Sequence, residues 1–594
     1  MIGELLRHYE EVVLFDTEFG CPDGGRAEPR CLVYRELGSG RLGRVWLDGA
    51  APAAPPYRTG ADTLFVAYYA SAELGCHLAL GWPLPARVLD LYAEFRNLTN
   101  GLTTPHGRGL LGALAHFGLH AMDTVEKEEM RALALRGGPY AADERAALLD
   151  YCQSDVDALA RLLPAILARI DLPRAVGFRG RYAAAVARME WAGVPIDTDV
   201  LRRLRDNWSV VRGQLVRAVN SGYGVYVPRD PGDPDGDWSF SSARWSQYLR
   251  ENGIPWPRLE SGTLALDDDT FREMAKRYPA EVGPIRELRH TLGQLRLNDL
   301  AVGSDGRNRC LLSPLSSRTG RNQPSNSKFI FGPACWLRSL IRPRPGRAIA
   351  YCDWSQQELA VAAALSHDAR MMDAYASGDF YLTFARMAGA VPPTATKETH
   401  GRERDQFKVV ALGVLYGLSE VGLARRLGVS LSEGRTLLGL HQRTFRRFWE
   451  WSQAVEEEAL LTGRLRTRFG WTLHIPAGND PETGRTIANP RSLRNFPVQG
   501  NAAGMMQIAA CLATERGVGV CCPVHDAFLI ESAAEAIEHE TGRMQAAMRE
   551  ASELVLPDFP LRSDAKVVRY PERYSDPRGD RMWDTVMGLL PLHQ

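Results

Sequence analysis

The chain has 594 residues, too many for a single hydrophobic core, so several domains are expected. An apolar fraction of 45% and a charged fraction of 24% are typical of a soluble globular protein, and the ten cysteines form no C-x-x-C pair, which argues against a zinc site or a disulfide framework. Basic and acidic residues number 71 each, so any nucleic-acid site must come from local clustering.

The first 170 residues or so predict an α/β domain. The N-terminus, MIGELLRHYEEVVLF, lacks the basic start and long apolar run of a signal peptide, and no run of about 18 apolar residues predicts a membrane span. Strands are expected over 11–19 and 63–69, and a long amphipathic helix over 141–170. The segment DLPRAVGF (171–178) predicts a Pro/Gly break, so we place the first domain at 1–175.

Two acids lie at the end of the first expected strand. Asp16 and Glu18 are two residues apart, so the period of a strand points both to one face. Neighbouring carboxylates repel each other, and Mg²⁺ prefers carboxylate oxygens, so the pair suggests a cation site. A strand-end acidic pair without function is the alternative interpretation.

Two later segments add to this pair. Glu73 follows the second strand, at the start of a predicted helix, whereas Tyr151 and Asp155 lie at i and i+4 on one helix face. The alternative for Tyr151 is a half-buried aromatic of that helix. The whole pattern resembles the 3′–5′ exonuclease domain of proofreading DNA polymerases, which has a ribonuclease H-like fold.

The resemblance implies two-metal hydrolysis of a phosphodiester, with Tyr151 orienting the attacking water. The metal ligands that it implies are Asp16, Glu18, Glu73 and Asp155. The family usually has an aspartate, often preceded by asparagine, where this chain has Glu73. Asp90 is therefore a rival for the role of the second-motif acid.

The rest of the chain mixes helices and strands. The segment 179–310 is mostly helical in pattern and is interrupted by an acidic Pro/Gly loop at 227–237. Strands are expected at 347–355 and 517–532, and the segment 366–490 between them is largely helical in pattern. The C-terminal tail shows little pattern.

A second set of acids is carried by these two expected strands. Asp353 ends the first, and a helix follows that begins near Ser355-x-x-Glu358, a spacing that also fits a capping box with no further role. His525 and Asp526 interrupt the second strand, where we expect it to turn. Two aspartates at strand ends on one sheet would share two Mg²⁺ ions.

A polar stripe lies on the helix predicted between the two strands. Arg404, Lys408, Leu412 and Tyr416 recur every four residues. Core-facing stripes are normally apolar, and one that begins with two cations and ends with tyrosine favours contacts to a triphosphate and a base. An exposed basic turn followed by core residues is the alternative interpretation.

These segments resemble motifs A, B and C of family A DNA polymerases, the bacterial DNA polymerase I and phage type. Further matches in chain order are ARMEWAGVPID, SSRTGRNQPSN, SGDFYLTFA, TRFGWTLHIP and RNFPVQGNAAG. With the exonuclease pattern, the resemblance covers nearly the whole chain. It implies a right-hand polymerase domain over 176–594, with a thumb at about 179–310, a palm at about 311–375 and 491–594, and fingers at about 376–490. We expect no 5′ nuclease domain.

By matching position, Asp353 and Asp526 are implied to bind two Mg²⁺ ions, with Mn²⁺ as a substitute, and to drive phosphoryl transfer. Arg404 and Lys408 are implied to hold the dNTP phosphates, and Lys408 to protonate the pyrophosphate. The remaining implied roles are the nucleotide pocket for Leu412, Tyr416 and Tyr381, a gate against a 2′-OH for Glu358, minor-groove contacts for Arg321 and Gln499, and the primer end for His525.

Four positions depart from the family pattern. Leu412 lies where an aromatic residue usually stacks on the base, Tyr381 where histidine is common, Gly504 where aspartate is usual, and Ala527 where the family has glutamate. We expect the loss of that glutamate to tune metal affinity rather than abolish synthesis. A basic cluster, made of Arg338, Arg342, Arg344 and Arg347, is interpreted either as a contact to phosphates or as a solvated loop.

The sequence therefore predicts a template-directed DNA polymerase with 3′–5′ exonuclease proofreading, acting on primer–template DNA and dNTPs. The alternative is a DNA-binding 3′–5′ exonuclease with a degenerate polymerase scaffold, and RNA-templated synthesis also stays open. Retention of Asp353, Asp526, Arg404 and Lys408 favours an active polymerase. We expect a monomer in the cytoplasm of a bacterial or phage-infected cell; whether a processivity factor or helicase binds it stays open.

Overall fold

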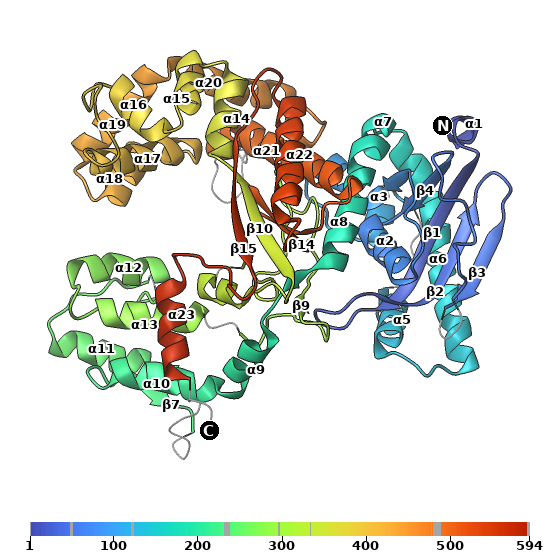
Figure 1. Cartoon of the computed structure of the whole chain (residues 1–594), viewed down its shortest axis with the longest axis horizontal. Coiled ribbons are helices and arrows are strands. Elements are labelled where there is room, and N and C mark those ends of the chain that lie inside the picture. Colours follow the sequence, from blue (N-terminus) through green and yellow to red (C-terminus); the bar gives the residue numbers. More distant parts are fainter. Residues whose placement is uncertain are drawn as a thin grey trace. The chain divides into compact units, whose positions relative to one another are not determined.

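The computed structural model describes residues 2–47, 51–119, 124–230, 238–259, 261–294, 297–332, 334–476, 478 and 489–590. The chain forms two compact units, coloured along the sequence in Figure 1. Unit 1 comprises Met1–Gly193, Leu311–Gln323 and Ile349–Val567, and unit 2 comprises Val194–Cys310, Pro324–Ala348 and Val568–Gln594. These units group the chain differently from the predicted domains, whose limits stay predictions.

The N-terminal part of unit 1 is built on a five-stranded sheet of order β3-β2-β1-β4-β5. Its strands are β1 (Glu11–Gly20), β2 (Glu28–Glu36), β3 (Leu42–Trp46), β4 (Thr63–Ala67) and β5 (Val88–Asp90). Strands β1, β2 and β3 pair antiparallel, whereas β4 pairs parallel with both β1 and β5. The two strands expected from the sequence, β1 and β4, are confirmed.

Helices cover both faces of this sheet, which explains why β1 is an almost continuous apolar run. Val12 and Leu14 belong to one buried cluster, and Val13 and Phe15 to another on the opposite face. The helices of this region are α1 (Ile2–His8), α2 (Ala70–Ala79), α3 (Leu91–Thr99), α4 (Leu110–His116), α5 (Thr124–Arg136), α6 (Ala142–Leu167) and α8 (Arg181–Ala192). The apolar run ends at Asp16, where the side chains become polar.

The Pro/Gly break expected at 171–178 is wrong, because this segment is helical. It forms α7 (Leu172–Arg174) and the π-helix η1 (Ala175–Gly180), which lead directly into α8. Proline is tolerated because it lies in the first turn, and the Asp171 carboxylate caps that turn by accepting the Arg174 N–H at 3.2 Å. Gly180 then lets η1 approach β5, since a Cβ there would lie 1.8 Å from the Val88 carbonyl oxygen.

A four-stranded sheet of order β13-β14-β10-β15 forms the centre of the later segments. Its strands are β10 (Arg347–Trp354), β13 (Val520–Val524), β14 (Ala527–Ala533) and β15 (Ser563–Arg569), of which sequence reasoning missed β15. Helices α14 (Gln357–Ser366), α21 (Pro490–Glu515) and α22 (Ile537–Val555) accompany it in the chain.

The described part of 366–490 is largely helical, as expected. Its elements are α15 (Ala369–Ala376), α16 (Phe380–Met387), α17 (Gly401–Leu415), α18 (Glu420–Leu427), α19 (Leu431–Thr444) and α20 (Arg446–Thr462), followed by the hairpin β11 (Arg464–Arg466) and β12 (Thr472–His474).

Helix α3 fastens the N-terminal sheet to these later segments within unit 1. The buried Arg96 guanidinium donates to the Leu315 carbonyl at 3.0 and 3.1 Å and also to that of Ser316. The Asn97 amide donates to the Gly470 carbonyl at 3.1 Å. Asn100 follows with bonds to the carbonyls of Arg318 and Thr472, at 2.7 and 2.8 Å. Buried side-chain bonds of this kind fix the helix in place.

Unit 2 is mainly helical around a core that contains Trp245 and Phe271. Its elements are β6 (Val194–Pro195), α9 (Thr198–Asp206), α10 (Trp208–Asn220), β7 (Tyr226–Pro228), β8 (Trp238–Phe240), α11 (Ser242–Glu251), α12 (Asp268–Arg277), α13 (Gly283–Gln294), β9 (Arg307–Asn308), η2 (Cys335–Leu340) and α23 (Asp580–Leu589). Residues 231–237 of the expected acidic loop lie outside the described residues. Within the described ranges, no helix combines the length and the apolar composition needed to cross a bilayer.

Neither interpretation of the basic cluster holds for Arg338. Its guanidinium is buried and lies 2.6 Å from the Asp576 carboxylate, which is equally buried. Arg342 likewise pairs with Asp197 at 2.5 Å. These two arginines serve the fold of unit 2.

Candidate active sites

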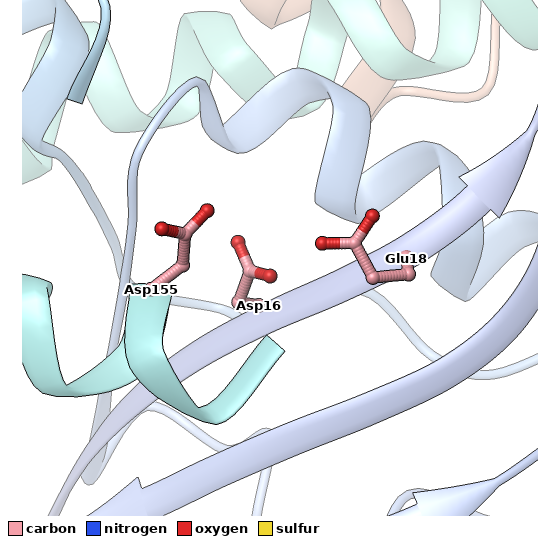
Figure 2. Close-up of side chains that lie close together, drawn as sticks. All are labelled: Asp16, Glu18 and Asp155. Carbon is pink, nitrogen blue, oxygen red and sulfur yellow. The ribbon is translucent and has the colours of Figure 1, made fainter. Parts of the chain in front are cut away.

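The first site lies where β1 meets α6. Asp16 and Glu18 come from the end of the strand and Asp155 from the helix, and one carboxylate oxygen of each lies within 4.8 Å of the other two. Figure 2 shows the three carboxylates turned toward one another. Three oxygen ligands at this spacing fit a hard divalent cation such as Mg²⁺ or Mn²⁺. Three of the four predicted acids are thus brought together.

Glu73, from α2, is buried beside this trio. Burial, followed by the charge of Asp16, raises the pKa of Glu73 well above its usual range. Its Oε2 atom has no hydrogen-bond partner among the described residues. A buried acid beside other acids calls for a proton or a cation, so Glu73 also fits a metal site.

Asp90, the other candidate for the second-motif acid, caps helix α3. Its carboxylate accepts the N–H groups of Tyr69 and Tyr92, both at 3.0 Å, and that of Ala93 at 3.4 Å. It is therefore the N-cap of α3, with its acceptor oxygen committed to the backbone. This arrangement favours Glu73 over Asp90 as the second-motif acid.

The remaining predicted residue of this site, Tyr151, lies on α6 and is 6% exposed. Burial raises its pKa, and its hydroxyl bonds to Asp155. A cavity of about 400 Å³ opens beside the acids. Its lining combines acids, aromatic rings and a guanidinium, namely Asp16, Asp155, Tyr68, Tyr69, Tyr92 and Arg108, with Gly109 and Leu110.

The second site lies at the end of β10. His525 and Asp526 form the two-residue loop of the β13–β14 hairpin, in which Val524 pairs with Ala527 and His525 takes a left-handed φ of 53°. The Trp354 N–H donates to the Asp526 carbonyl at 3.2 Å, so the loop adjoins the residue after Asp353. Burial, then the charges of Asp526 and Asp564, raise the pKa of Asp353 to about 6. Two neighbouring acids in this state fit divalent cations.

The capping-box interpretation of Ser355 and Glu358 is wrong. Helix α14 begins after Gln356, whose φ is 57°, and no side chain caps it. The Ser355 hydroxyl instead donates to Asp564 at 2.5 Å. The Glu358 carboxylate accepts from Arg321 and from the Tyr416 hydroxyl, both at 2.7 Å, and is thereby held from two sides.

The predicted stripe begins on α17 and ends at its C-cap, Tyr416, and its residues are partly or fully exposed. The Arg404 Nε lies 2.6 Å from an Asp379 carboxylate oxygen. The Arg404 guanidinium and the Lys408 ammonium lie 5.4 and 5.8 Å from the centre of the Tyr381 ring, within cation–π range. Tyr416 is 48% exposed, so the stripe does not simply continue into the core.

The other predicted positions lie apart from these contacts. His525 is exposed at the hairpin tip, and Leu412 is half-buried on α17. Gln499 of α21 lines a cavity of about 320 Å³ with Arg318, Thr319 and His474. The sequence analysis did not predict a contact for Asp379 or Asp564. Asp379 could have been recognised as an N-cap because it precedes an apolar helix. Asp564 lies in the C-terminal segment, where no sequence pattern singles it out.

Residues 331–570 match the sequence model of DNA polymerase family A. That segment of the chain therefore resembles a family A polymerase domain. Among its relatives, DNA polymerase I of Chloroflexus aurantiacus is 26% identical over 366 residues, which are 59% of this chain and 38% of that protein. The enzyme of Aquifex aeolicus is 24% identical over 65% of either chain, and the thermostable DNA polymerase I of Thermus thermophilus is 30% identical over 37% of this chain and 27% of its own.

The chain spans from about a quarter to about two thirds of the length of these relatives. Its fold resembles the polymerase domain of Pol1 from M. smegmatis, solved in complex with DNA primer-template and dNTP, with a TM-score of 0.71 and 19% identity. That similarity covers 96% of this chain and 97% of the other. The mixed α/β polymerase fold expected from the sequence is therefore confirmed.

Proposed function

We propose that this family A polymerase extends the 3′ end of a DNA primer with dNTPs under the direction of a template, and that it removes mispaired ends by 3′–5′ exonuclease hydrolysis. The observation that carries synthesis is the placing of Asp353 beside the Asp526 hairpin, with the cations Arg404 and Lys408 on α17. An acidic pair binds metal, and a basic stripe binds phosphates.

In this scheme, Asp353 and Asp526 would hold two Mg²⁺ ions, which supply activation of the primer 3′-OH and charge stabilisation at the α-phosphate. Arg404 would bind the triphosphate as a fork, and Lys408 would bind it as a point charge and protonate the departing pyrophosphate. His525 would contact the primer end. The Tyr381 hydroxyl would donate to the triphosphate from α16.

Glu358 would act as the gate against a ribose 2′-OH. Its two hydrogen bonds, from Arg321 and Tyr416, hold the carboxylate rigidly, and a rigid side chain discriminates better than a mobile one. Tyr416 would border the insertion pocket, and Leu412 would face the base without stacking on it as an aromatic residue does. Arg321 and Gln499 would contact the minor groove of the new pair.

Hydrolysis is supported by the convergence of Asp16, Glu18 and Asp155 with Glu73 beside them. These four acids would hold two metal ions, and Tyr151 would orient the attacking water from its bond to Asp155. The strand order β3-β2-β1-β4-β5, with three antiparallel strands followed by two parallel ones, supports the ribonuclease H-like fold that this proposal assumes.

The test is a labelled primer–template incubated with Mg²⁺, with and without dNTPs. Extension with dNTPs and 3′ shortening without them are the expected results. Shortening without any extension would support the alternative, an exonuclease with a degenerate polymerase scaffold. An RNA template in a parallel reaction measures template choice.

A further inference from the structure

We propose that Arg96, on helix α3, is a positioning residue for the synthetic site: it holds a strained turn at 313–316, and this turn fixes the segment that presents Arg321 to Glu358. The inference rests on the proposed function of Glu358 as the gate against a ribose 2′-OH. It gives the N-terminal part of unit 1 a task in synthesis that is separate from its own hydrolytic site.

Arg96 is a cation buried without a carboxylate. It is 5% exposed and forms no ion pair with any residue that the structure describes, and burial lowers the pKa of its guanidinium. A buried charge is costly unless its donors find acceptors. The acceptors here are main-chain carbonyls: that of Leu315, at 3.1 Å from Nε and 3.0 Å from Nη2, and that of Ser316. The cation is thus spent on the backbone of one turn.

The turn that receives these bonds is strained. Ser313 and Leu315 have left-handed φ values of 47° and 58°. Residues with a Cβ rarely adopt this conformation, and leucine lacks the short polar side chain with which asparagine or aspartate stabilises it. Such a backbone persists only where its surroundings hold it. At Leu315 the Arg96 guanidinium does so, because two of its N–H groups donate to the one carbonyl oxygen.

A single peptide unit connects Arg96 with Arg321. The carbonyl of this unit, from Ser316, accepts from Arg96. Its N–H group, from Ser317, donates to the Arg321 carbonyl at 3.2 Å. The Arg321 N–H returns a bond to the Ser317 hydroxyl at 2.7 Å. Because hydrogen bonds fix both sides of this peptide, a shift of the turn would move the backbone of Arg321 with it.

Arg321 in turn fixes the carboxylate of Glu358. Its Nη2 atom donates to one carboxylate oxygen at 2.7 Å, and the Tyr416 hydroxyl donates to the other at the same distance. Without the first bond, Glu358 would be held by a tyrosine that is 48% exposed. A carboxylate held from one side would block a 2′-OH less well than one held from two. Selectivity for the sugar is therefore the property that Arg96 should control.

The experiment measures sugar selectivity as the ratio of single-turnover insertion efficiencies for dCTP and rCTP on one primer–template. The parent carries Asp16→Ala/Glu18→Ala, so that 3′ shortening does not compete. Arg96→Ala should lower the ratio about tenfold, and Arg96→Lys, which keeps the charge but not the fork of donors, should lower it by a smaller factor. The fraction of active enzyme cancels in this ratio, so a loss of stability alone would leave it unchanged.

Asn97→Ala is the matched control. Asn97 adjoins Arg96 on α3 and also joins a later segment, since its amide donates to the Gly470 carbonyl at 3.1 Å, but it does not bond to the 313–316 turn. Its replacement should change the ratio by less than about twofold. An equal loss of selectivity in Asn97→Ala and Arg96→Ala would overturn the role of Arg96, because the docking of α3 as a whole would then be the cause.

A double-mutant cycle tests whether Arg96 acts through Arg321. Arg321→Ala should lower the ratio at least as much as Arg96→Ala does, and adding Arg96→Ala to it should have no further effect. If Arg96→Ala does not fold, Arg96→Lys takes its place in the cycle. Independent effects of the two substitutions would overturn the inference, as would an unchanged ratio in both Arg96 variants.

Failure of this inference is distinguishable from failure of the proposed function. If the parent extends no primer, synthesis itself is rejected. If Glu358→Ala leaves the ratio unchanged, the gate is rejected together with the route through it. A parent that extends primers and loses selectivity in Glu358→Ala, but keeps it in both Arg96 variants, rejects the role of Arg96 alone.

Discussion

The two acidic sites bring their carboxylates together from different kinds of structural element. The N-terminal site gathers acids from one strand and two helices, and one of them, Glu73, is buried. The second site takes its acids from a strand end and a hairpin loop, and cations on α17 belong to the same unit. The hydrolysis proposed for the first site needs only metal and water, whereas the transfer proposed for the second must also hold a free triphosphate. The basic stripe is therefore the feature that would distinguish the two proposed chemistries.

The largest expected effect separates the two sites. Asp353→Ala removes one of the two acids proposed to hold the metal ions, and extension should fall by about 10³-fold or more while 3′ shortening continues. A gel assay of both reactions on one primer measures this. Loss of both activities together would show that the sites are not independent.

The reciprocal change is Asp16→Ala/Glu18→Ala. It removes two of three converging carboxylates, so 3′ shortening should fall by about 10³-fold while extension is retained. The rate of shortening without dNTPs is the measurement. Persistent shortening would place hydrolysis elsewhere in the protein.

The sites themselves were only partly predictable from sequence. Asp16 and Glu18, or Tyr151 and Asp155, lie on one strand or one helix, where local periodicity sets the direction of each side chain. Asp353 and Asp564 are neighbours only through the register of two strands far apart in the chain, which no local pattern encodes. The spacing of Ser355 and Glu358 fits a capping box, but both side chains form hydrogen bonds with residues distant in sequence instead.

A smaller effect distinguishes Glu73 from Asp90. Glu73→Gln keeps the shape but removes the charge, and should reduce 3′ shortening by about 10²-fold. Asp90→Asn should leave cleavage nearly unchanged, because asparagine can also cap α3. Asp90→Ala, which removes the cap, should cost about 1 kcal/mol of stability in chemical denaturation. The reverse ranking of cleavage rates would make Asp90 the metal ligand.

The smallest expected effect concerns the cations of the second site. Asp379 holds Arg404 at 2.6 Å and also caps α16 by accepting the Leu382 N–H at 3.2 Å. Asp379→Asn keeps the cap but removes the charge that competes with a triphosphate. The dNTP dissociation constant in single-turnover insertion should fall by about two- to fivefold, or roughly 0.4 to 1 kcal/mol. Weaker binding would show that Asp379 instead positions Arg404 for the substrate.

Helix α3 links the proposed hydrolytic site to later segments of unit 1, which bears on how a mispaired primer end could reach that site. It starts at the cap Asp90 beside the first cavity, and its Arg96 and Asn97 are bonded to the carbonyls of Leu315 and Gly470. Because these bonds join the N-terminal sheet to the segment that carries Arg321, we expect the proposed hydrolytic site to keep its place while a primer end moves to it. The ease with which the primer end unpairs would then set how often the proposed editing occurs.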